Sequence, residues 1–270
     1  MKGLRMAGVT DPGKRRSNNE DAIATVPALG LAILADGMGG HLAGEVASGI
    51  AVDIVKRGLI NELDDSKKRT RQNGLSPEAA ALKDSIELAN RAIHEASSQH
   101  TEYAGMGSTI AVVLFHGNKV CIAHVGDSRV YRLRDGKLVQ VTEDHSMIQE
   151  LLRRGFITPE EAKLSTNKNM VTRALGVESN VEVELAEETV HEGDIYLLCS
   201  DGLSDVLEDA VVEQILLRFD TEFENALEYM VTEVNAKGGP DNVSAVLVRA
   251  QRNFKRDREA VKELADAASR

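Results

Sequence analysis

The stretch Ile33-Leu34-Ala35-Asp36-Gly37-Met38-Gly39-Gly40-His41 decides how the fold of this chain is interpreted. An apolar run ends in a carboxylate, and three glycines follow it within four residues. The pattern predicts a buried strand that carries Asp36 to the edge of a sheet. The glycines predict a backbone turn with positive φ directly after the aspartate.

Three further segments place an aspartate within two residues of a glycine, and in two of them an apolar run comes just before it. They are Val125-Gly126-Asp127-Ser128-Arg129, Cys199-Ser200-Asp201-Gly202 and Gly238-Gly239-Pro240-Asp241-Asn242. An Asp-Gly pair is a common turn, and any one of these aspartates alone would be interpreted that way. Four of them at strand ends predict one oxygen-rich metal site, assembled from distant parts of the chain.

Composition narrows the class of protein. The 270 residues carry a net charge of −11, which argues against binding to nucleic acid or to an anionic membrane, because such proteins present a basic face. Cys121 and Cys199 lie in apolar runs, so we expect two core side chains, no disulfide framework and a reducing compartment. No apolar stretch approaches the ~20 residues of a membrane span, and the N-terminus lacks a signal-peptide pattern. A cytoplasmic protein is expected.

The first part of the chain is predicted to bring two aspartates close together. Residues 4–9, 22–26 and 29–35 are predicted strands, and pairing of the last two would place Asp21 near Asp36, with Arg16 on the approaching loop. Two helices follow, over residues 43–59 and from the N-cap Ser76 to about residue 99. Residues 61–74 between them are expected to form an exposed loop.

The middle of the chain is predicted as a meander and an insertion. The predicted strands 109–115, 119–125, 128–133 and 137–141 have short connections, typical of consecutive antiparallel pairing. Residues 145–176 interrupt them with a helix over 146–154 ended by Gly155 and a second begun by the capping box Thr158-Pro159-Glu160-Glu161. This insertion is either a flap beside the site or a decoration of the surface.

The remaining residues complete one domain. Strands are predicted over residues 181–185, 194–199 and 243–248, and a helix over 222–235. The charged tail 253–270 is expected to be a weak helix at best. With no repeat and no linker, we expect a single domain over residues 1–252, with the flap at about 145–176 and the tail outside it.

The chemistry of the acids favours hydrolysis of phosphate esters. Oxygen ligands suit Mg²⁺ or Mn²⁺, and no HxxxH or CxxC pair offers zinc a site. Asp21, Asp36, Asp201 and Asp241 would repel one another, so they imply more than one cation. Two metal ions turn a bridging water into a nucleophile, and the Arg16 guanidinium can bind phosphate oxygens.

Five motifs in order resemble those of the metal-dependent protein phosphatases (PPM, or 2C-type), and the form of the second resembles the bacterial branch. The motifs are Arg16-Ser17-Asn18-Asn19-Glu20-Asp21, Asp36-Gly37-Met38-Gly39-Gly40-His41, Gly126-Asp127-Ser128-Arg129, Ser200-Asp201-Gly202 and Asp241-Asn242. The resemblance implies an α+β fold, a four-layer α/β/β/α sandwich of two antiparallel sheets flanked by helices. It implies hydrolysis of phosphoserine and phosphothreonine in proteins, opposite a Ser/Thr kinase, by a monomer.

The resemblance also implies roles for individual residues. Asp36 would bridge two Mn²⁺ or Mg²⁺ ions, Gly37 would offer its carbonyl and Asp21 would serve one ion. Asp201 and Asp241 would serve the other ion. Asp127 would hold a third, with Asp201 or Asp205, and Arg16 would bind the phosphate. Apart from the resemblance, Glu20 is either a ligand itself or a partner of the ligands, and the second alternative is favoured.

One position departs from the family. Animal relatives carry a histidine, the proposed general acid, where this chain has Met38, and a thioether cannot donate a proton. His41 is the candidate to replace it; the alternatives are that His41 structures the glycine loop and that a metal-bound water protonates the leaving group. Two other functions are alternatives: a catalytically inactive phosphatase-like signalling or binding module, and a two-metal phosphodiesterase or nuclease, which the acidic charge disfavours.

Overall fold

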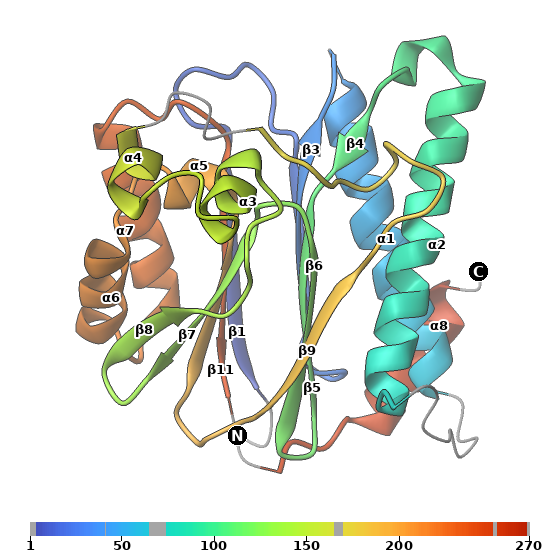
Figure 1. Cartoon of the computed structure of the whole chain (residues 1–270). Coiled ribbons are helices and arrows are strands. Elements are labelled where there is room, and N and C mark those ends of the chain that lie inside the picture. The colour runs from blue at the N-terminus through green and yellow to red at the C-terminus, as the bar shows by residue number, and fades with distance from the viewer. Residues whose placement is uncertain (1–3, 41, 65–73, 165–169, 251–252, 269–270) are drawn as a thin grey trace.

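Two antiparallel sheets lie face to face, with helices covering the outer side of each (Figure 1). The computed structural model describes residues 4–40, 42–64, 74–164, 170–250 and 253–268. The expected four-layer α+β sandwich is confirmed by this arrangement. Within the described residues, no helix combines the length and apolar character that crossing a bilayer requires.

The first sheet has the strand order β1-β11-β10-β7-β8. The second has the order β2-β3-β5-β6-β9, with the short β4 paired to β3. The strands of the first sheet are β1 Arg5–Asp11, β7 Arg129–Arg134, β8 Lys137–Gln140, β10 Ile195–Cys199 and β11 Val243–Arg249. Those of the second are β2 Asp21–Val26, β3 Leu31–Met38, β4 Gly107–Ser108, β5 Ile110–His116, β6 Lys119–Val125 and β9 Glu184–Thr189.

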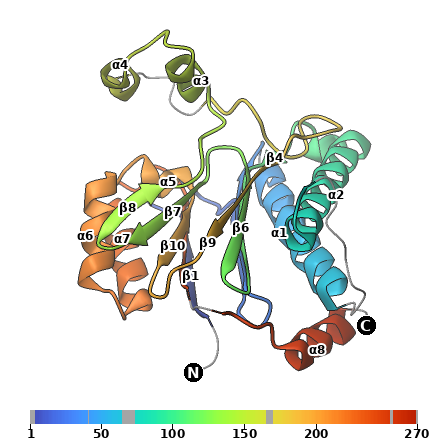
Figure 2. The same cartoon turned by 60° about the horizontal axis from the view of Figure 1, so that its bottom comes forward.

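The helices divide between the two outer layers and the insertion. The second sheet is covered by α1 Ala43–Asp64 and α2 Pro77–Gln99, with α8 Arg258–Ala268 packed against α1. The first sheet is covered by α6 Asp209–Arg218 and α7 Phe223–Ala236, with the short α5 Asp201–Ser204 at its end. The insertion carries α3 Met147–Arg153 and α4 Pro159–Leu164, which stand away from the sandwich (Figure 2). A 3₁₀ turn, Thr101–Tyr103, follows α2.

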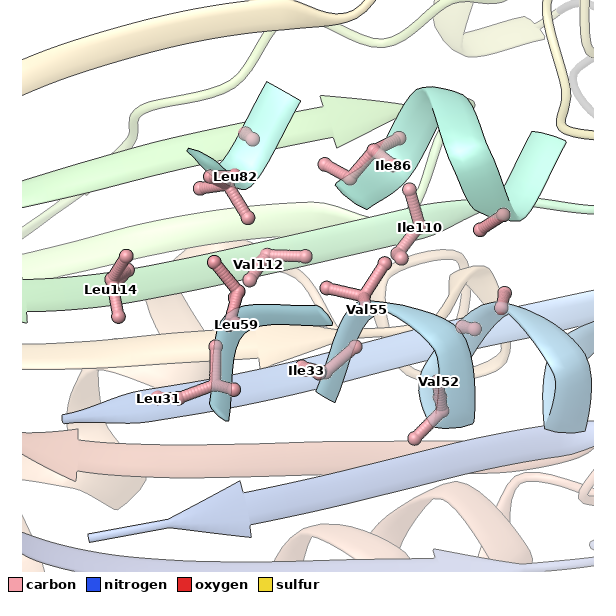
Figure 3. Close-up of a cluster of buried hydrophobic side chains, with 14 of the residues drawn as sticks. Leu31, Ile33, Val52, Val55, Leu59, Leu82, Ile86, Ile110, Val112 and Leu114 are labelled. Atoms are coloured by element: carbon pink, nitrogen blue, oxygen red, sulfur yellow. The ribbon is translucent and has the colours of Figure 1, made fainter. Parts of the chain in front are cut away.

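The apolar run of β3 is buried on both faces because it lies in the interior of the sandwich. Leu31 and Ile33 point outward and pack on the helices, as Figure 3 shows with Val55 and Leu59 of α1. The side chain of Leu34 points to the other face of β3 and belongs to the cluster between the two sheets. Side chains of a strand alternate between its faces, so a strand with apolar residues at every position must be covered on both sides.

Several local predictions are confirmed. Ser76 caps α2 by accepting the N–H of Ala79 at 3.1 Å, and Pro77 is its first residue. Thr158 and Glu161 form the predicted capping box, with reciprocal bonds of 3.2 and 2.8 Å. These features depend only on neighbouring residues, which is why sequence patterns find them.

The predicted meander is wrong. β5 pairs with β6 in the second sheet and β7 pairs with β8 in the first, so residues 126–128 cross between sheets instead of forming a hairpin turn. A short glycine-containing connection is equally compatible with a hairpin and with a crossing at the rim of a sandwich. Which one forms depends on the partners that each strand finds in the tertiary structure.

Three boundaries also differ from prediction. The last strand of the second sheet is β9 Glu184–Thr189, displaced from the predicted 181–185, and α1 continues to Asp64, into the predicted loop. Residues 65–73 of that loop and residues 165–169 of the insertion lie outside the described residues. The tail, expected to be a weak helix at best, forms α8, whose Val261 is 2% exposed. Burial of its apolar face supplies the stabilisation that the charged sequence lacks.

Candidate metal centre

Strand pairing brings together two aspartates of the second sheet. Asp21 is the first residue of β2, Asp36 lies near the end of β3, and their Cα atoms are direct partners in the antiparallel register. Thr109 fixes this end of β3: its N–H donates to the Asp36 carbonyl at 2.8 Å, and its Oγ1 accepts the Asp36 N–H at 3.0 Å. The predicted proximity of Asp21 and Asp36 is confirmed.

Two further aspartates come from the first sheet. Asp201 follows β10 as the first residue of α5, and Asp241 lies two residues before β11. Because β10 and β11 are antiparallel neighbours, the end of one and the start of the other meet at the same edge. Ser200 connects the sheets there, since its hydroxyl donates to Asp21 Oδ2 at 3.1 Å.

Asp127 lies on the crossing between the sheets. It follows the last residue of β6 by two positions and precedes β7. Gly126 allows this path, because its φ is +104° and an added Cβ would lie 2.6 Å from Thr109 Cγ2. The Asp127 side chain is 8% exposed, so the crossing holds a nearly buried carboxylate at the same end of the sandwich as the others.

Glycine is needed beside the aspartates for close backbone contact. An added Cβ on Gly37 would lie 2.0 Å from the carbonyl oxygen of Gly44 in α1, and one on Gly202 would lie 1.9 Å from that of Asn242. The predicted positive φ occurs at Gly39, two residues later than expected, because β3 continues through Gly37 and Met38.

Burial and mutual repulsion disfavour the charged forms of these carboxylates. Burial raises the pKa of Asp21 and of Asp127 to about 6 and that of Asp201 to about 7, and nearby acids add to the effect. Burial likewise raises the pKa of Asp36 well above its ordinary value, reinforced by the charges of Asp21, Asp201, Asp127 and Asp241. These carboxylates are therefore costly to ionise unless a cation offsets their charge.

The donor set fits hard divalent cations. Asp21 Oδ1 is buried and has no hydrogen-bond partner among the described residues. A carboxylate oxygen in that position is costly unless a cation or a proton meets it. Aspartate oxygens with no sulfur or imidazole among them are the ligands that Mg²⁺ and Mn²⁺ prefer.

Asn242 clamps the loop that precedes β2. Its Nδ2 donates to the carbonyl oxygens of Pro12 and Asn18 at 3.0 and 2.8 Å, and its Oδ1 accepts the N–H of Glu20 at 2.9 Å. The clamp holds the loop that carries Arg16 against the centre. The sequence motif contains Asn242 but predicts no role for it; the available signal is its place directly after Asp241, the last predicted ligand.

Arg16 reaches the centre from that loop. The Nη2 atom of Arg16 contacts Asp241 Oδ2 at 2.8 Å, and the Arg16 side chain is 53% exposed. The hydrogen bond with Asp241 raises the pKa of Arg16, so the guanidinium is charged and accessible. Glu20 lies against α1 instead. Its Oε2 is so close to Gly44 of α1 that a Cβ added to this glycine would lie 2.5 Å from it. That position fits the predicted role of a partner of the ligands.

The insertion lies beside the site. A groove of about 790 Å³ is lined by Asp127 and Asp201, by α3 and α4 residues such as Leu152 and Ala162, and by the α5–α6 region. Asp205 also lines it, and its charge raises the pKa of both Asp127 and Asp201. The decorative alternative for the insertion is thus disfavoured. His41, the candidate acid, lies outside the described residues.

The family follows from comparison with known proteins. The model of the family described as "Protein phosphatase 2C" matches residues 13–248. The chain belongs to the protein phosphatase 2C family. As a family member it is a metal-dependent serine/threonine protein phosphatase, and the expected Mn²⁺ or Mg²⁺ requirement agrees with the oxygen ligands of the centre.

Bacterial members of the protein phosphatase 2C family are similar over nearly the whole chain. The chain is 38% identical over 243 residues to serine/threonine phosphatase stp of Listeria innocua. The match covers 88% of this chain and 93% of the relative. The chain is also 38% identical over 244 residues to PstP of Mycobacterium tuberculosis. The match covers 90% of this chain and 44% of PstP.

Solved structures agree in fold. A crystal structure of M. tuberculosis PstP superposes with a TM-score of 0.81 at 37% identity, covering 93% of this chain and all of that one. The catalytic domain of PstP in complex with two manganese ions gives a TM-score of 0.78 at 38% identity, covering 92% of this chain and 98% of that one. The 2C-type sandwich predicted from the motifs is thus confirmed.

Proposed function

We propose that Asp21, Asp36, Asp201 and Asp241, with the carbonyl of Gly37, hold two Mn²⁺ or Mg²⁺ ions for the hydrolysis of phosphoserine and phosphothreonine in proteins. The observation that carries this assignment is the buried Asp21 Oδ1, which has no hydrogen-bond partner among the described residues and lies amid aspartates whose pKa values are raised. Bound ions would supply a nucleophilic water and neutralise charge on the phosphoryl oxygens. The complex of PstP with two manganese ions supports the number of ions.

The remaining roles belong to residues around the centre. Arg16, which is exposed and held near Asp241, would bind and orient two phosphate oxygens through its guanidinium. His41 would donate a proton to the leaving oxygen of the serine or threonine. Asp127, with Asp201 or Asp205, would hold a third ion. The groove beside them has the size of a site for a peptide segment around the phosphoresidue.

The biological setting is proposed at the same level. Residues 1–252 would act as the phosphatase domain, and its substrates would be proteins phosphorylated by a cognate Ser/Thr kinase in the cytoplasm. The family match over residues 13–248 supports the extent of the domain. We expect a monomer, because catalysis as described draws every named residue from one chain.

An assay with a matched control tests the assignment. Phosphate release from a phosphothreonine peptide in Mn²⁺ should fall about 100-fold or more in Asp36→Asn, because a metal ligand supplies several kcal/mol to the transition state. Asp53→Asn is the control, since Asp53 lies on the exposed side of α1 in an ion pair with Arg57. Equal activity of both variants would contradict the assignment of Asp36.

The same assay separates the alternative of an inactive phosphatase-like module. Such a module would bind Mn²⁺, with binding lost in Asp36→Asn, yet release no phosphate from peptide or from an aryl phosphate. Metal-dependent release that EDTA abolishes supports the enzyme and excludes the inactive module.

A further inference from the structure

Three side chains of the second sheet bring one metal-ligand atom each to a single point, far from the aspartates. They are His116 at the end of β5, Cys121 in β6 and Glu187 in β9. Cys121 Sγ lies 3.3 Å from His116 Nε2 and 3.4 Å from Glu187 Oε1, and the last two atoms are 3.3 Å apart. The three atoms form a nearly equilateral triangle.

Strand register places these residues on one face. Cys121 is the direct partner of Leu114 on β5 and of Glu187 on β9. His116 lies two residues beyond Leu114, so its side chain projects to the same face. That face is the one covered by α2, since Leu114 and Cys121 both belong to the core beneath the helices.

The cluster and the aspartates lie at opposite ends of the sheet. His116 ends β5, whereas Thr109, just before β5 begins, bonds to Asp36. Cys121 lies near the start of β6, whereas Asp127 follows its end. The proposed phosphatase centre therefore contributes no atom to the cluster.

The triangle has the dimensions of one face of a tetrahedral zinc site. Zinc binds sulfur at about 2.3 Å, imidazole nitrogen at about 2.0–2.1 Å and carboxylate oxygen at about 2.0–2.2 Å. In a tetrahedral site the nitrogen and oxygen therefore lie about 3.3–3.5 Å apart, and the sulfur lies about 3.5–3.7 Å from each of them. The 3.3 Å between His116 Nε2 and Glu187 Oε1 matches this spacing, and the sulfur, at 3.3 and 3.4 Å, would move outward by about 0.1–0.3 Å. An ion could bind with little movement of the side chains.

Groups that could make the outer contacts of such a site lie near the triangle. A histidine that binds a metal through one nitrogen usually gives its other N–H to a carboxylate. Glu78 Oε2 lies 3.7 Å from His116 Nδ1, and Arg256 holds the other oxygen of Glu78 at 3.2 Å. The Ser76 hydroxyl lies 3.8 Å from Cys121 Sγ.

The cluster is reachable from solvent, and one of its ligands, Glu187, carries a charge that suits a cation. Cys121 is buried, but the side chains of His116 and Glu187 are 17% and 23% exposed, so an ion can enter from their side. Burial acts to raise the pKa of Glu187, yet hydrogen bonds from Ser76 and Cys121 and the charge of Lys119 hold it below its ordinary value. Glu187 therefore offers a full negative charge to a cation.

We propose that His116 Nε2, Cys121 Sγ and Glu187 Oε1 bind one Zn²⁺ ion, with water as the fourth ligand, and that this ion ties β5, β6 and β9 together. On binding, the S–H bond of Cys121 breaks, a Zn–S bond forms and the proton passes to solvent. His116 stays neutral, with its proton on Nδ1 toward Glu78. Soft sulfur combined with imidazole selects zinc over Mg²⁺ or Mn²⁺.

Cobalt provides a probe that the aspartate centre does not disturb. Co²⁺ replaces Zn²⁺ in such sites, and a thiolate ligand gives it a charge-transfer band in the near ultraviolet, which ligands of oxygen alone do not. With Mg²⁺ in excess, titration of the full chain with Co²⁺ should produce this band with an end point of one equivalent. Added Zn²⁺ should then abolish it.

Four variants show which residues bind the Co²⁺ ion that gives the band. It should disappear in Cys121→Ser and persist in Cys199→Ser, the matched control, because Cys199 is the other buried free cysteine. It should persist in Asp36→Asn, which separates this site from the phosphatase centre. Glu187→Gln keeps the thiol, and Co²⁺ should bind it at least about 10-fold more weakly.

The outcomes are decisive for folded protein, verified by circular dichroism. Absence of the band in the wild-type chain would overturn the proposal, as would a band that survives Cys121→Ser or is lost in Cys199→Ser or Asp36→Asn. If Cys121→Ser does not fold, unchanged Co²⁺ affinity in Glu187→Gln would overturn it equally.

Discussion

The hydroxyl of Ser200 donates to Asp21 Oδ2 at 3.1 Å and accepts the backbone N–H of Ser244 at 3.0 Å. Ser200 follows β10 of the first sheet, and Asp21 begins β2 of the second. This single side chain therefore connects the two sheets at the candidate metal centre. It also orients a carboxylate whose other oxygen has no partner among the described residues.

Replacement of Ser200 by alanine should weaken metal binding and stability together. The change leaves the Ser244 N–H buried without an acceptor, which costs about 1–3 kcal/mol. Loss of a partner that orients a ligand typically lowers metal affinity about 10–100-fold. Urea denaturation and Mn²⁺ titration measure the two effects. Wild-type Mn²⁺ affinity in a folded Ser200→Ala variant would contradict the orienting role.

Gly37→Ala should disrupt the centre through its backbone. The added Cβ would lie 2.0 Å from the Gly44 carbonyl oxygen, so β3 and α1 must move apart, at a cost of about 3 kcal/mol or more. Gly40→Ala is the control, since an added Cβ there meets nothing within 4 Å. Thermal denaturation should show a large loss for the first variant and a small change for the second. Equal effects would mean that the contact of Gly37 with Gly44 is not tight.

The metal-free protein should be less stable as the pH rises from about 4 to about 7. Burial raises the pKa of Asp127 to about 6 and that of Asp201 to about 7, from an ordinary value of 3.8. At any pH between the ordinary pKa and the raised one, the folded state therefore binds more protons than the unfolded state. Stability from these groups is present at low pH and lost as the pH rises through the folded pKa values.

Asp127→Asn isolates one contribution. In EDTA at a pH of about 7.5 this variant should be roughly 1–3 kcal/mol more stable than the wild type, and its stability should depend less on pH. Urea midpoints at several pH values measure both quantities. A variant less stable than the wild type across the whole range would show that Asp127 is ionised without penalty.

His41→Ala should separate substrates by their leaving groups. Phenolate is a poor leaving group that needs a proton, whereas p-nitrophenolate needs little. General acid catalysis contributes about 10²–10⁴-fold, so kcat on phenyl phosphate should fall at least about 100-fold and kcat on p-nitrophenyl phosphate much less. Steady-state kinetics on both substrates measures the ratio. Equal losses would assign His41 to the glycine loop instead.

The sequence by itself determined the parts of this protein that depend on local pattern. The apolar run ending at Asp36 and the other aspartates near glycines predicted the oxygen-rich centre, and Ser76 predicted the capped start of α2. The ordered motifs resembled those of one family, and that resemblance implied the sandwich. Each signal arises within a few residues: a strand buried on both faces is apolar throughout, and a cap bonds to a residue three positions away.

Tertiary structure alone decided what joins distant segments. Whether residues 126–128 turn back or cross between sheets depends on strand partners, and the clamp by Asn242 depends on how β11 meets the loop before β2. The triangle of His116, Cys121 and Glu187 has no metal-binding spacing in sequence, because register across three strands creates it. Side chains far apart along the chain become ligands of one site only when pairing fixes which face and which end of a sheet they share.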